Sequence, residues 1–256
     1  MNSQFKKRLK RGDLLVGTIV TLASTEMAEI FCLSGFDWLF VDLEHSSLSV
    51  ADAQHLLQVV TQKIPCTIRV PTNDEVWIKK VLDTGASGVV SPQIRTAMDA
   101  ERVVQLCKYP PEGTRSVGIA RAHGYGGNFD SYISSANEST AVIVQIEHID
   151  AVNNIEKILD VSGIDCLFVG PYDLSGSMGK IGRIADTHVQ EAISHVSRCA
   201  GKANVPLGIF AATPEAAVPY IQTGYNLIAV GIDTLLIRSA SERILHTLKD
   251  LTQGVD

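Results

Sequence analysis

Short apolar runs alternate along the chain with longer segments whose apolar residues recur every three or four positions. The short runs are rich in β-branched residues and predict buried strands, and the longer segments predict amphipathic helices. The predicted strands are 14–19, 36–41, 66–70, 88–90, 141–146, 166–169, 207–210 and 227–230. The predicted helices are 25–33, 50–60, 75–82, 98–106, 151–159, 189–200, 215–223 and 235–251, with a short additional helix over 131–136.

Eight strands that alternate with eight longer helical segments predict an α/β fold, a parallel (β/α)8 TIM barrel. A doubly wound open sheet is the alternative. No change of composition marks a second domain, so residues 1–256 are predicted to form one barrel domain. Neither GxGxxG after the first strand nor GxxxxGK[ST] occurs in the sequence, and nucleotide binding has no local support.

Polar residues are most informative in the stretch 141–179, which reads as strand, helix and strand. Gln145 and Glu147 stand at the end of its first strand, and Asp173 follows the second. The carboxyl ends of neighbouring parallel strands lie on one side of a sheet, so the two carboxylates are predicted to meet. Such an all-oxygen pair suits a hard divalent cation. The alternative is a helix-capping Asp and a solvated Glu.

Other strand ends carry polar residues as well. Asp42, Glu44 and His45 follow the second strand, Arg69 ends the third, and Gln93 follows the fourth. Active sites of (β/α)8 barrels lie at this end of the strands, so the concentration predicts a site there. As alternatives, His45 caps a helix at the surface and Arg69 pairs with a nearby carboxylate for structural reasons.

These residue types together predict chemistry on a 2-oxo acid. A metal on Glu147 and Asp173 leaves positions for water and substrate, and it would chelate the keto and carboxylate oxygens and stabilise an enolate. Arg69 can hold a carboxylate through its planar fork. His45 titrates near neutrality and can move a proton. No lysine stands at a strand end, so an aldolase with a Schiff-base lysine is not expected.

Charge and cysteine content narrow the class of protein. A net charge of −6 argues against a nucleic-acid partner. The five cysteines have neither metal-ligand nor redox spacing, which predicts reduced thiols in a cytoplasmic protein. No stretch is apolar enough to span a membrane. The basic stretch 6–11 and the apolar run after it look like a signal peptide, but Asp13 interrupts them, and we expect a short surface helix with Phe5 and Leu9 on one face.

Several longer segments add a resemblance to these single residues. They are GFDWLFVDLEHSSLS (35–49), RVP (69–71), KYPPEGTRSVG (108–118), VQIEHIDAVNNIEKIL (144–159), FVGPYDLSGSMG (168–179) and AVGIDTLLI (229–237). In content and order they resemble the HpcH/HpaI aldolase family over nearly the whole chain. The resemblance implies a class II pyruvate aldolase, which cleaves 4-hydroxy-2-oxo acids reversibly to pyruvate and an aldehyde. Family substrates include 4-hydroxy-2-oxo-heptanedioate and 2-keto-3-deoxy sugar acids.

The resemblance also implies roles for single residues. Glu147 and Asp173 would bind the divalent metal (Mg²⁺, Mn²⁺ or Co²⁺), with no nucleotide or pyridoxal phosphate. Arg69 and Gln145 would contact pyruvate, and His45 would be the acid/base residue, oriented by Asp42 or Asp83. The pyruvate carboxylate would be held by Gly170, Pro171, Tyr172 and Asp173. Phe210 would shape the aldehyde pocket. The implied assembly is a homohexamer, a trimer of dimers, in which the last helix exchanges with a neighbouring subunit.

Two departures from the family pattern leave the natural aldehyde open. Ser46-Ser47 stands where the family often has Ala-Pro, and 115–118 reads RSVG in place of RGVG. The second lies in a long stretch rich in Gly and Pro, 109–128, which we expect to be functional. Both departures are expected near the entry of the aldehyde. The competing hypotheses are a citramalyl- or malyl-CoA-type lyase and a non-catalytic barrel that binds 2-oxo acids.

Overall fold

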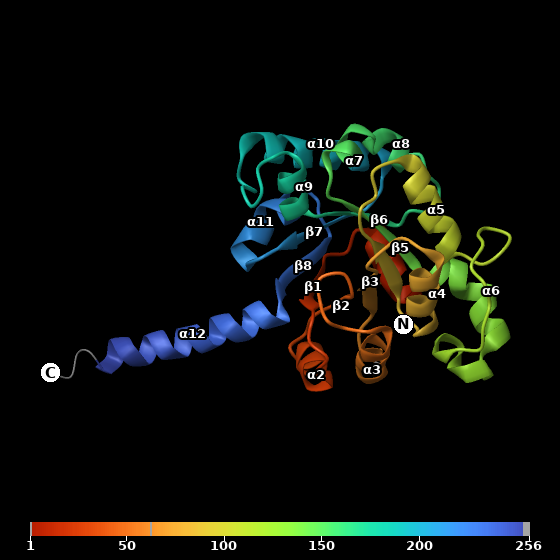
Figure 1. Cartoon of the computed structure of the whole chain (residues 1–256), viewed down its shortest axis with the longest axis horizontal. Coiled ribbons are helices and arrows are strands. Elements are labelled where there is room, and N and C mark those ends of the chain that lie inside the picture. The colour runs from red at the N-terminus through yellow and green to blue at the C-terminus, as the bar shows by residue number, and fades with distance from the viewer. Residues whose placement is uncertain (1, 62, 253–256) are drawn as a thin grey trace.

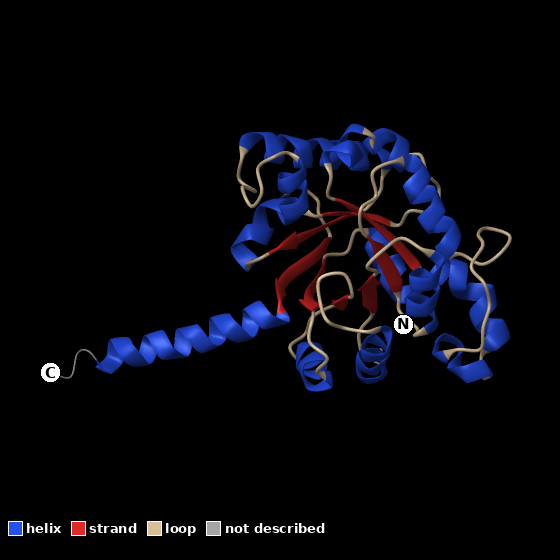
Figure 2. Ribbon diagram, in the orientation of Figure 1, coloured by secondary structure: helices blue, strands red, loops and turns tan. Residues whose placement is uncertain are grey.

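The computed structural model describes residues 2–61 and 63–252, and within them the strands form one closed parallel barrel (Figures 1 and 2). The strands are β1 (Leu15–Val20), β2 (Trp38–Asp42), β3 (Cys66–Arg69), β4 (Gly88–Ser91), β5 (Ala141–Ile146), β6 (Cys166–Val169), β7 (Leu207–Ala211) and β8 (Leu227–Ile232). Each strand pairs in parallel with the next, and β8 pairs with β1. The predicted (β/α)8 barrel is confirmed, and the open sheet is excluded.

Helices surround the barrel and alternate with its strands. They are α1 (Asn2–Arg11), α2 (Thr25–Leu33), α3 (Val50–Val60), α4 (Glu75–Asp83), α5 (Ala97–Cys107), η1 (Arg121–Gly126), α6 (Phe129–Ser139), α7 (Ile149–Asn153), α8 (Ile155–Leu159), α9 (Pro171–Ser177), α10 (Thr187–Ala203), α11 (Pro214–Gln222) and α12 (Asp233–Thr252). The predicted helix 151–159 is two short helices that meet at Asn154, and the sequence predicted neither α9 nor η1.

Alternation along each strand divides the core in two. Phe40 and Phe168 belong to the cluster inside the barrel, and Val41 and Ile68 belong to the cluster between the strands and the surrounding helices. Residues two apart on a strand face the same side. Asp42 therefore follows Phe40 inward, at the carboxyl end of its strand, and the polar residues at the other strand ends are placed in the same way.

Helix α1 closes the opposite, amino-terminal end of the barrel. Phe5 and Leu9 are buried in the interior cluster, with the Phe5 ring 6.1 Å from the Trp38 ring. Lys6 is buried beside them, where its ammonium lies 2.8 Å from Asp165 and donates to the carbonyl of Thr140 at 3.0 Å. The predicted helix with Phe5 and Leu9 on one face is confirmed, and that face seals the barrel.

The long stretch 109–128 also lies at the amino-terminal end, because α5 returns the chain there before β5 begins. Its Arg121 donates to the carbonyl of Leu57 at 3.2 Å, at the end of α3. Arg115 is buried against Asp83 (2.8 Å) and the ring of Tyr109 (4.5 Å). The expectation that RSVG borders the aldehyde entry is thus wrong within this chain.

Helix α12 leaves the barrel after β8 and projects from it as an arm (Figures 1 and 2). Only its first residue, Asp233, is buried, and its carboxylate accepts hydrogen bonds from the N–H groups of Thr21 (2.7 Å) and Leu22 (2.8 Å). The apolar side chains of α12 are 39–67% exposed: Leu235, Leu236, Ile237, Ile244, Leu245, Leu248 and Leu251. We call these seven residues the arm face. No helix within 2–61 and 63–252 has the length and apolarity needed to cross a bilayer.

The Lys6–Asp165 pair provides a test of how the barrel is closed. Asp165→Asn would leave a buried ammonium without its carboxylate, and breaking a buried pair in this way costs about 3–5 kcal/mol. We expect the free energy of unfolding to fall by that amount in urea titrations. Glu242→Gln, which breaks an exposed pair with Arg238, is the matched control and should change little. Equal stability of the two variants would contradict a buried, paired Lys6.

Candidate active site

A bidentate ion pair forms the base of the site at the carboxyl end of the barrel. Asp42 and Arg69 are paired in register on β2 and β3. Arg69 donates from Nε to Oδ1 of Asp42 at 2.8 Å and from Nη2 to Oδ2 at 2.7 Å, and both side chains are buried. Burial would raise the pKa of Asp42, but the hydrogen bonds and charge of Arg69 hold that pKa below its ordinary value. The pair therefore fixes the guanidinium in place at the strand ends.

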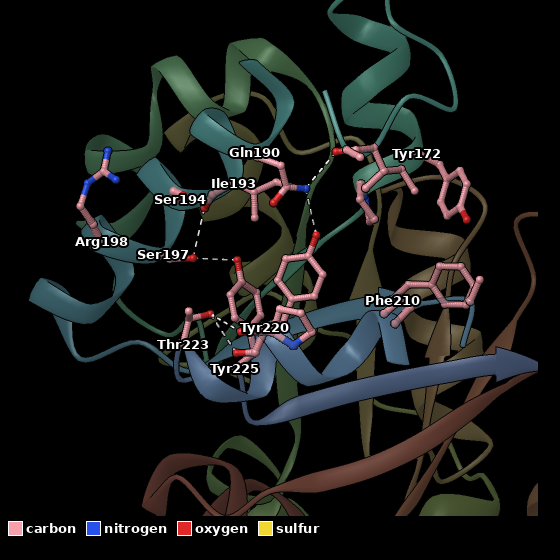
Figure 3. A pocket seen from close by; sticks show the side chains of 17 residues that line it. Tyr172, Gln190, Ile193, Ser194, Ser197, Arg198, Phe210, Tyr220, Thr223 and Tyr225 are labelled. Carbon is pink, nitrogen blue, oxygen red and sulfur yellow. Dashed lines mark hydrogen bonds between the residues drawn. The ribbon is translucent and has the colours of Figure 1, made fainter. Parts of the chain in front are cut away.

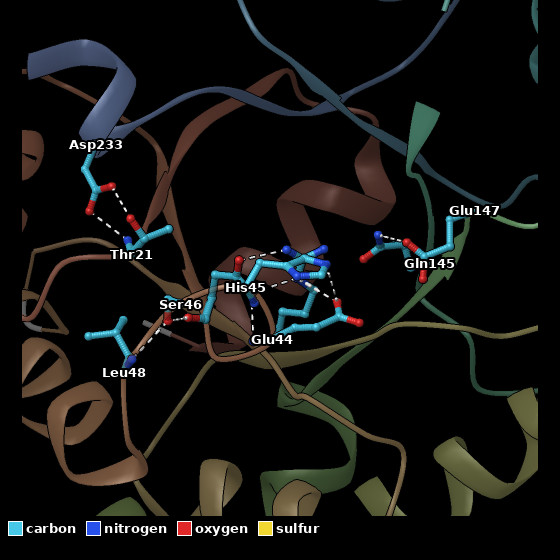
Figure 4. A network of polar contacts seen from close by, with 10 residues as sticks. Thr21, Glu44, His45, Ser46, Leu48, Gln145, Glu147 and Asp233 are labelled. Atoms are coloured by element: carbon cyan, nitrogen blue, oxygen red, sulfur yellow. Dashed lines mark hydrogen bonds and ion pairs between the residues drawn. The ribbon is translucent and has the colours of Figure 1, made fainter. Parts of the chain in front are cut away.

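Asp42 also holds the loop that carries His45. Its Oδ1 accepts the N–H groups of Glu44 at 2.9 Å and His45 at 3.4 Å. The His45 ring is largely exposed, and its Nε2 lies 3.9 Å from Oε2 of Glu44 (Figure 4). Asp42 therefore positions the backbone of His45, and neither of the two predicted carboxylates contacts its ring within the described chain. Asp83 pairs with Arg115 at the opposite end of the barrel, so it is not the orienting residue within this chain.

Glu147 is held by three amide hydrogen bonds. Its Oε1 accepts from the backbone N–H of Gln93 at 2.7 Å and from Nε2 of Gln93 at 3.0 Å, and its Oε2 accepts from Gln145 (Figure 4). Gln145, near the end of β5, and Glu147, directly after it, share the inward face, as predicted. A Cβ on Gly170 would come within 2.9 Å of both Gln145 Nε2 and Glu147 Cβ, so this position, directly after β6, requires a glycine.

The carboxylates at this rim outnumber the cations beside them. Burial, with smaller contributions from neighbouring carboxylates, raises the pKa of Glu44 to about 6, although the Arg69 charge opposes the shift. Burial raises the pKa of Glu147 to about 7, the N–H of Gln93 opposes the shift, and the negative charges of Glu44 and Asp173 add to it. Burial is thus the main cause of both shifts and the like charges of neighbouring carboxylates add to it, so a bound cation would favour the ionised forms of Glu44 and Glu147.

The donor set fits a hard cation. Oε1 of Gln145 and Oε2 of Glu44 are buried and accept no hydrogen bond from the described residues. Those residues contain no group of three or more His, Cys, Asp or Glu side chains that could hold a metal ion. A metal between Glu147 and Asp173 would thus have two protein carboxylates and several free positions, a pattern typical of Mg²⁺.

The predicted residues gather around two adjoining cavities. The first, of about 190 Å³, is lined by Asp42, His45, Arg69, Gln145, Gly170, Pro171, Tyr172, Asp173 and Phe210 among others. The second, of about 460 Å³, is lined by Gln93 and Glu147 and shares Tyr172 and Asp173 with the first. Of the two candidate metal ligands, Asp173 lines both cavities and Glu147 lines the second. Their position after predicted strands is the one feature of the sequence that singles out Glu44 and Gln93. The sequence did not predict the contacts that these two residues make.

A third cavity, of about 720 Å³, lies between α10 and α11 (Figure 3). It shares Pro171, Tyr172 and Phe210 with the first cavity, and the rings of Tyr172 and Phe210 stand 6.0 Å apart where the two meet. The hydroxyls of Ser197 and Tyr225 lie 2.8 Å apart in its lining, and the hydroxyl of Tyr220 accepts from Nε2 of Gln190 at 3.2 Å. This cavity was not predicted from the sequence.

Comparisons with known proteins place this geometry in a family. The sequence profile described as HpcH/HpaI aldolase/citrate lyase matches residues 16–240. The 2-keto-3-deoxy-L-rhamnonate aldolase of Escherichia coli (strain K12) is 36% identical over 257 residues, which cover 99% of this chain and 96% of that protein.

Solved structures agree. A HpcH/HpaI aldolase/citrate lyase family protein from Burkholderia cenocepacia J2315 superposes with a TM-score of 0.93 at 34% identity, over 96% of this chain and 99% of that one. The citrate synthase SbnG superposes with a TM-score of 0.87 at 27% identity, over 97% and 98%. The profile match and the aldolase relative together show that this chain is an aldolase-type lyase and belongs to the HpcH/HpaI aldolase/citrate lyase family.

Proposed function

We propose that the protein is a metal-dependent pyruvate aldolase that cleaves 4-hydroxy-2-oxo acids reversibly to pyruvate and an aldehyde. One observation carries the proposal: the buried Glu147, the half-buried Glu44 and the exposed Asp173 bring their negative charges together near a fixed Arg69 at the carboxyl end of the barrel. That arrangement offers a divalent cation two carboxylates and places an anion-binding guanidinium next to it. The aldolase relative supports the reaction class.

The chain's own residues bind and orient the substrate in this proposal. Glu147 and Asp173 would hold Mg²⁺, Mn²⁺ or Co²⁺, and the bound ion would supply Lewis-acid polarisation of the keto group. Arg69, held by Asp42, faces the same cavity as Gln145 and would contact the 2-oxo acid. Gly170, Pro171 and Tyr172 form the entry to α9, where backbone N–H groups favour an anion such as the substrate carboxylate.

His45 is the proposed acid/base residue. It would take the proton from the C4 hydroxyl as the C3–C4 bond breaks, so that C4 leaves as the aldehyde and C3 keeps the electron pair and gains a proton to give pyruvate. Among the described residues, the lining of the first cavity contains His45 and Arg69 but no lysine. The proposal therefore assigns no imine step. Since the aldolase relative acts on a 2-keto-3-deoxy sugar acid, we propose acids of this type as the first substrates to test.

The role of the metal is tested by removing it. EDTA should abolish cleavage, and Mg²⁺, Mn²⁺ or Co²⁺ should restore it, because an all-oxygen site prefers such ions. Borohydride added with pyruvate should leave activity intact, because no lysine imine forms. Pyruvate release is followed with a coupled dehydrogenase. Activity that survives EDTA, or that borohydride destroys, would sink the proposal.

The role of His45 is tested by comparing two reactions of the same site. His45→Ala should lower aldol cleavage by about 10²–10⁴-fold, the usual effect of removing a general base. It should lower oxaloacetate decarboxylation much less, because that reaction has no hydroxyl proton to remove. Glu147→Gln and Asp173→Asn should lower both reactions. If His45→Ala lowers the two equally while Mn²⁺ and pyruvate still bind, the base is another residue, with Glu44 the first to examine.

We also propose that the protein is a homo-oligomer, a trimer of dimers, in which α12 packs on a neighbouring subunit. The arm face supports this proposal, since an apolar helix face needs burial and the chain's own barrel leaves it exposed. Burying the side chains of Ile244 and Leu248 against a partner would stabilise the assembly by the hydrophobic effect.

The assembly is tested by charging the arm face. Ile244→Asp combined with Leu248→Asp should shift the protein from a hexamer to smaller species in multi-angle light scattering. Arg243→Asp adds the same type of residue outside the arm face and should leave the hexamer intact. A doubly charged variant of unchanged size, or a wild-type protein that is monomeric, would contradict the proposal.

A further inference from the structure

Gln93 adopts a backbone conformation that L-residues avoid. Its φ is +56°, and among the described non-glycine residues only Tyr125 and Asn204 share a positive φ. Asn204 ends helix α10, where this conformation is common, and Tyr125 lies in the turn of η1. Gln93 is the one of the three that lies at the catalytic rim. A strained residue persists only where its surroundings fix it, and such residues gather at functional sites.

Contacts on both sides hold Gln93 in this conformation. The preceding carbonyl, of Pro92, accepts a hydrogen bond from the side chain of Asn73, and the following side chain, Ile94, is fully buried. The side-chain carbonyl of Gln93 accepts from Nη2 of Arg95 at 3.1 Å. That bond sets the orientation of the amide and turns its Nε2 toward Glu147.

The left-handed conformation lets one residue donate twice to one carboxylate oxygen. The backbone N–H and Nε2 of Gln93 both reach Oε1 of Glu147, at 2.7 Å and 3.0 Å. With Oε1 fixed by two donors, the carboxylate cannot rotate, and Oε2 stays on the side of Gln145 and Gly170. The φ of Gln93 sets the direction of its side chain relative to its N–H, and in this conformation both donors reach the same oxygen.

We propose that Gln93 is a positioning residue for the metal ligand Glu147, and that its strained conformation is kept because it orients that carboxylate before the cation arrives. The inference rests on the proposed function, in which Glu147 binds a divalent ion. Hydrogen-bond partners of metal ligands typically contribute 10–100-fold to metal affinity or activity. Gln93 would act through Glu147 and would not touch the substrate.

Mn²⁺ binding to the substrate-free protein, measured by titration with electron paramagnetic resonance detection of free Mn²⁺, tests the inference without any assay of turnover. Gln93→Gly keeps the N–H donor and relieves the strain but removes Nε2. Gln93→Leu removes Nε2 and keeps a strained side chain. Both variants should weaken Mn²⁺ binding by about 10–100-fold. The melting temperature of the metal-free Gln93→Gly protein should not fall, because glycine accepts a positive φ freely.

Controls separate this inference from the function on which it rests. Asn204→Gly makes the same backbone change far from the rim and should leave Mn²⁺ affinity unchanged. Glu147→Gln should abolish binding. If Glu147-dependent binding is seen in the wild type but is equally tight in both Gln93 variants, the positioning role is overturned and the proposed function stands. If Gln93→Gly lowers the melting temperature and leaves affinity intact, Gln93 has only a structural role. If the wild type binds no Mn²⁺, both ideas fail.

Discussion

The buried ion pair between Asp42 and Arg69 is the interaction on which the rest of the site depends. Removing two charges from water costs several kcal/mol for each ion, and only good geometry offsets that cost. Here two parallel hydrogen bonds join the pair, and Asp42 accepts two further N–H groups from the loop after β2. The pair forms because β2 and β3 are neighbours in register, so closure of the barrel creates it. In turn the pair places Arg69 in the lining of the first cavity and holds the loop that bears His45.

The two ends of the barrel differ in how their charged side chains are paired. At the amino-terminal end α1 fills the interior with Phe5 and Leu9, and the charge of Lys6 is matched by Asp165. At the carboxyl end Glu147 is buried and Glu44 is half-buried, and this burial raises the pKa of each although the charge of Arg69 opposes the shift. The amino-terminal end thus serves stability, and the carboxyl end carries the candidate site. This division is typical of (β/α)8 enzymes.

Helix α12 is anchored to the barrel at its first residue and is exposed beyond it. The anchor at Asp233 fixes the start of the arm to the β1 loop, and the arm face beyond it has no cover within the chain. Gln93 shows the constraint on a smaller scale, since it keeps a costly backbone conformation in return for a fixed Glu147. Gln93 keeps a locally unfavourable feature because the orientation of Glu147 depends on it, and the arm face is the surface that we propose a neighbouring subunit covers.

The sequence by itself determined the barrel and the composition of its rim. Apolar runs of strand length between helical repeats are enough to predict eight buried parallel strands, and alternation along a strand puts Gln145 and Glu147 on one face. Polar residues after several of these runs then indicate a site, because parallel strands end on the same side. These inferences need only local periodicity and the chain order. The structure confirms the barrel and brings these polar residues together at its carboxyl end.

Tertiary structure alone decided which polar residues meet. Asp42 pairs with Arg69 and holds the backbone of His45. Asp83 instead pairs with Arg115 at the amino-terminal end of the barrel. The stretch 109–128, which was expected at the aldehyde entry, lies at that end as well. The sequence left Asp42 and Asp83 as equal candidates, because position after a helix or strand does not give the distance between residues far apart along the chain. Strand register and barrel closure set those distances. The same holds for Gln93, whose left-handed backbone is imposed by contacts on both sides and not by its own preference.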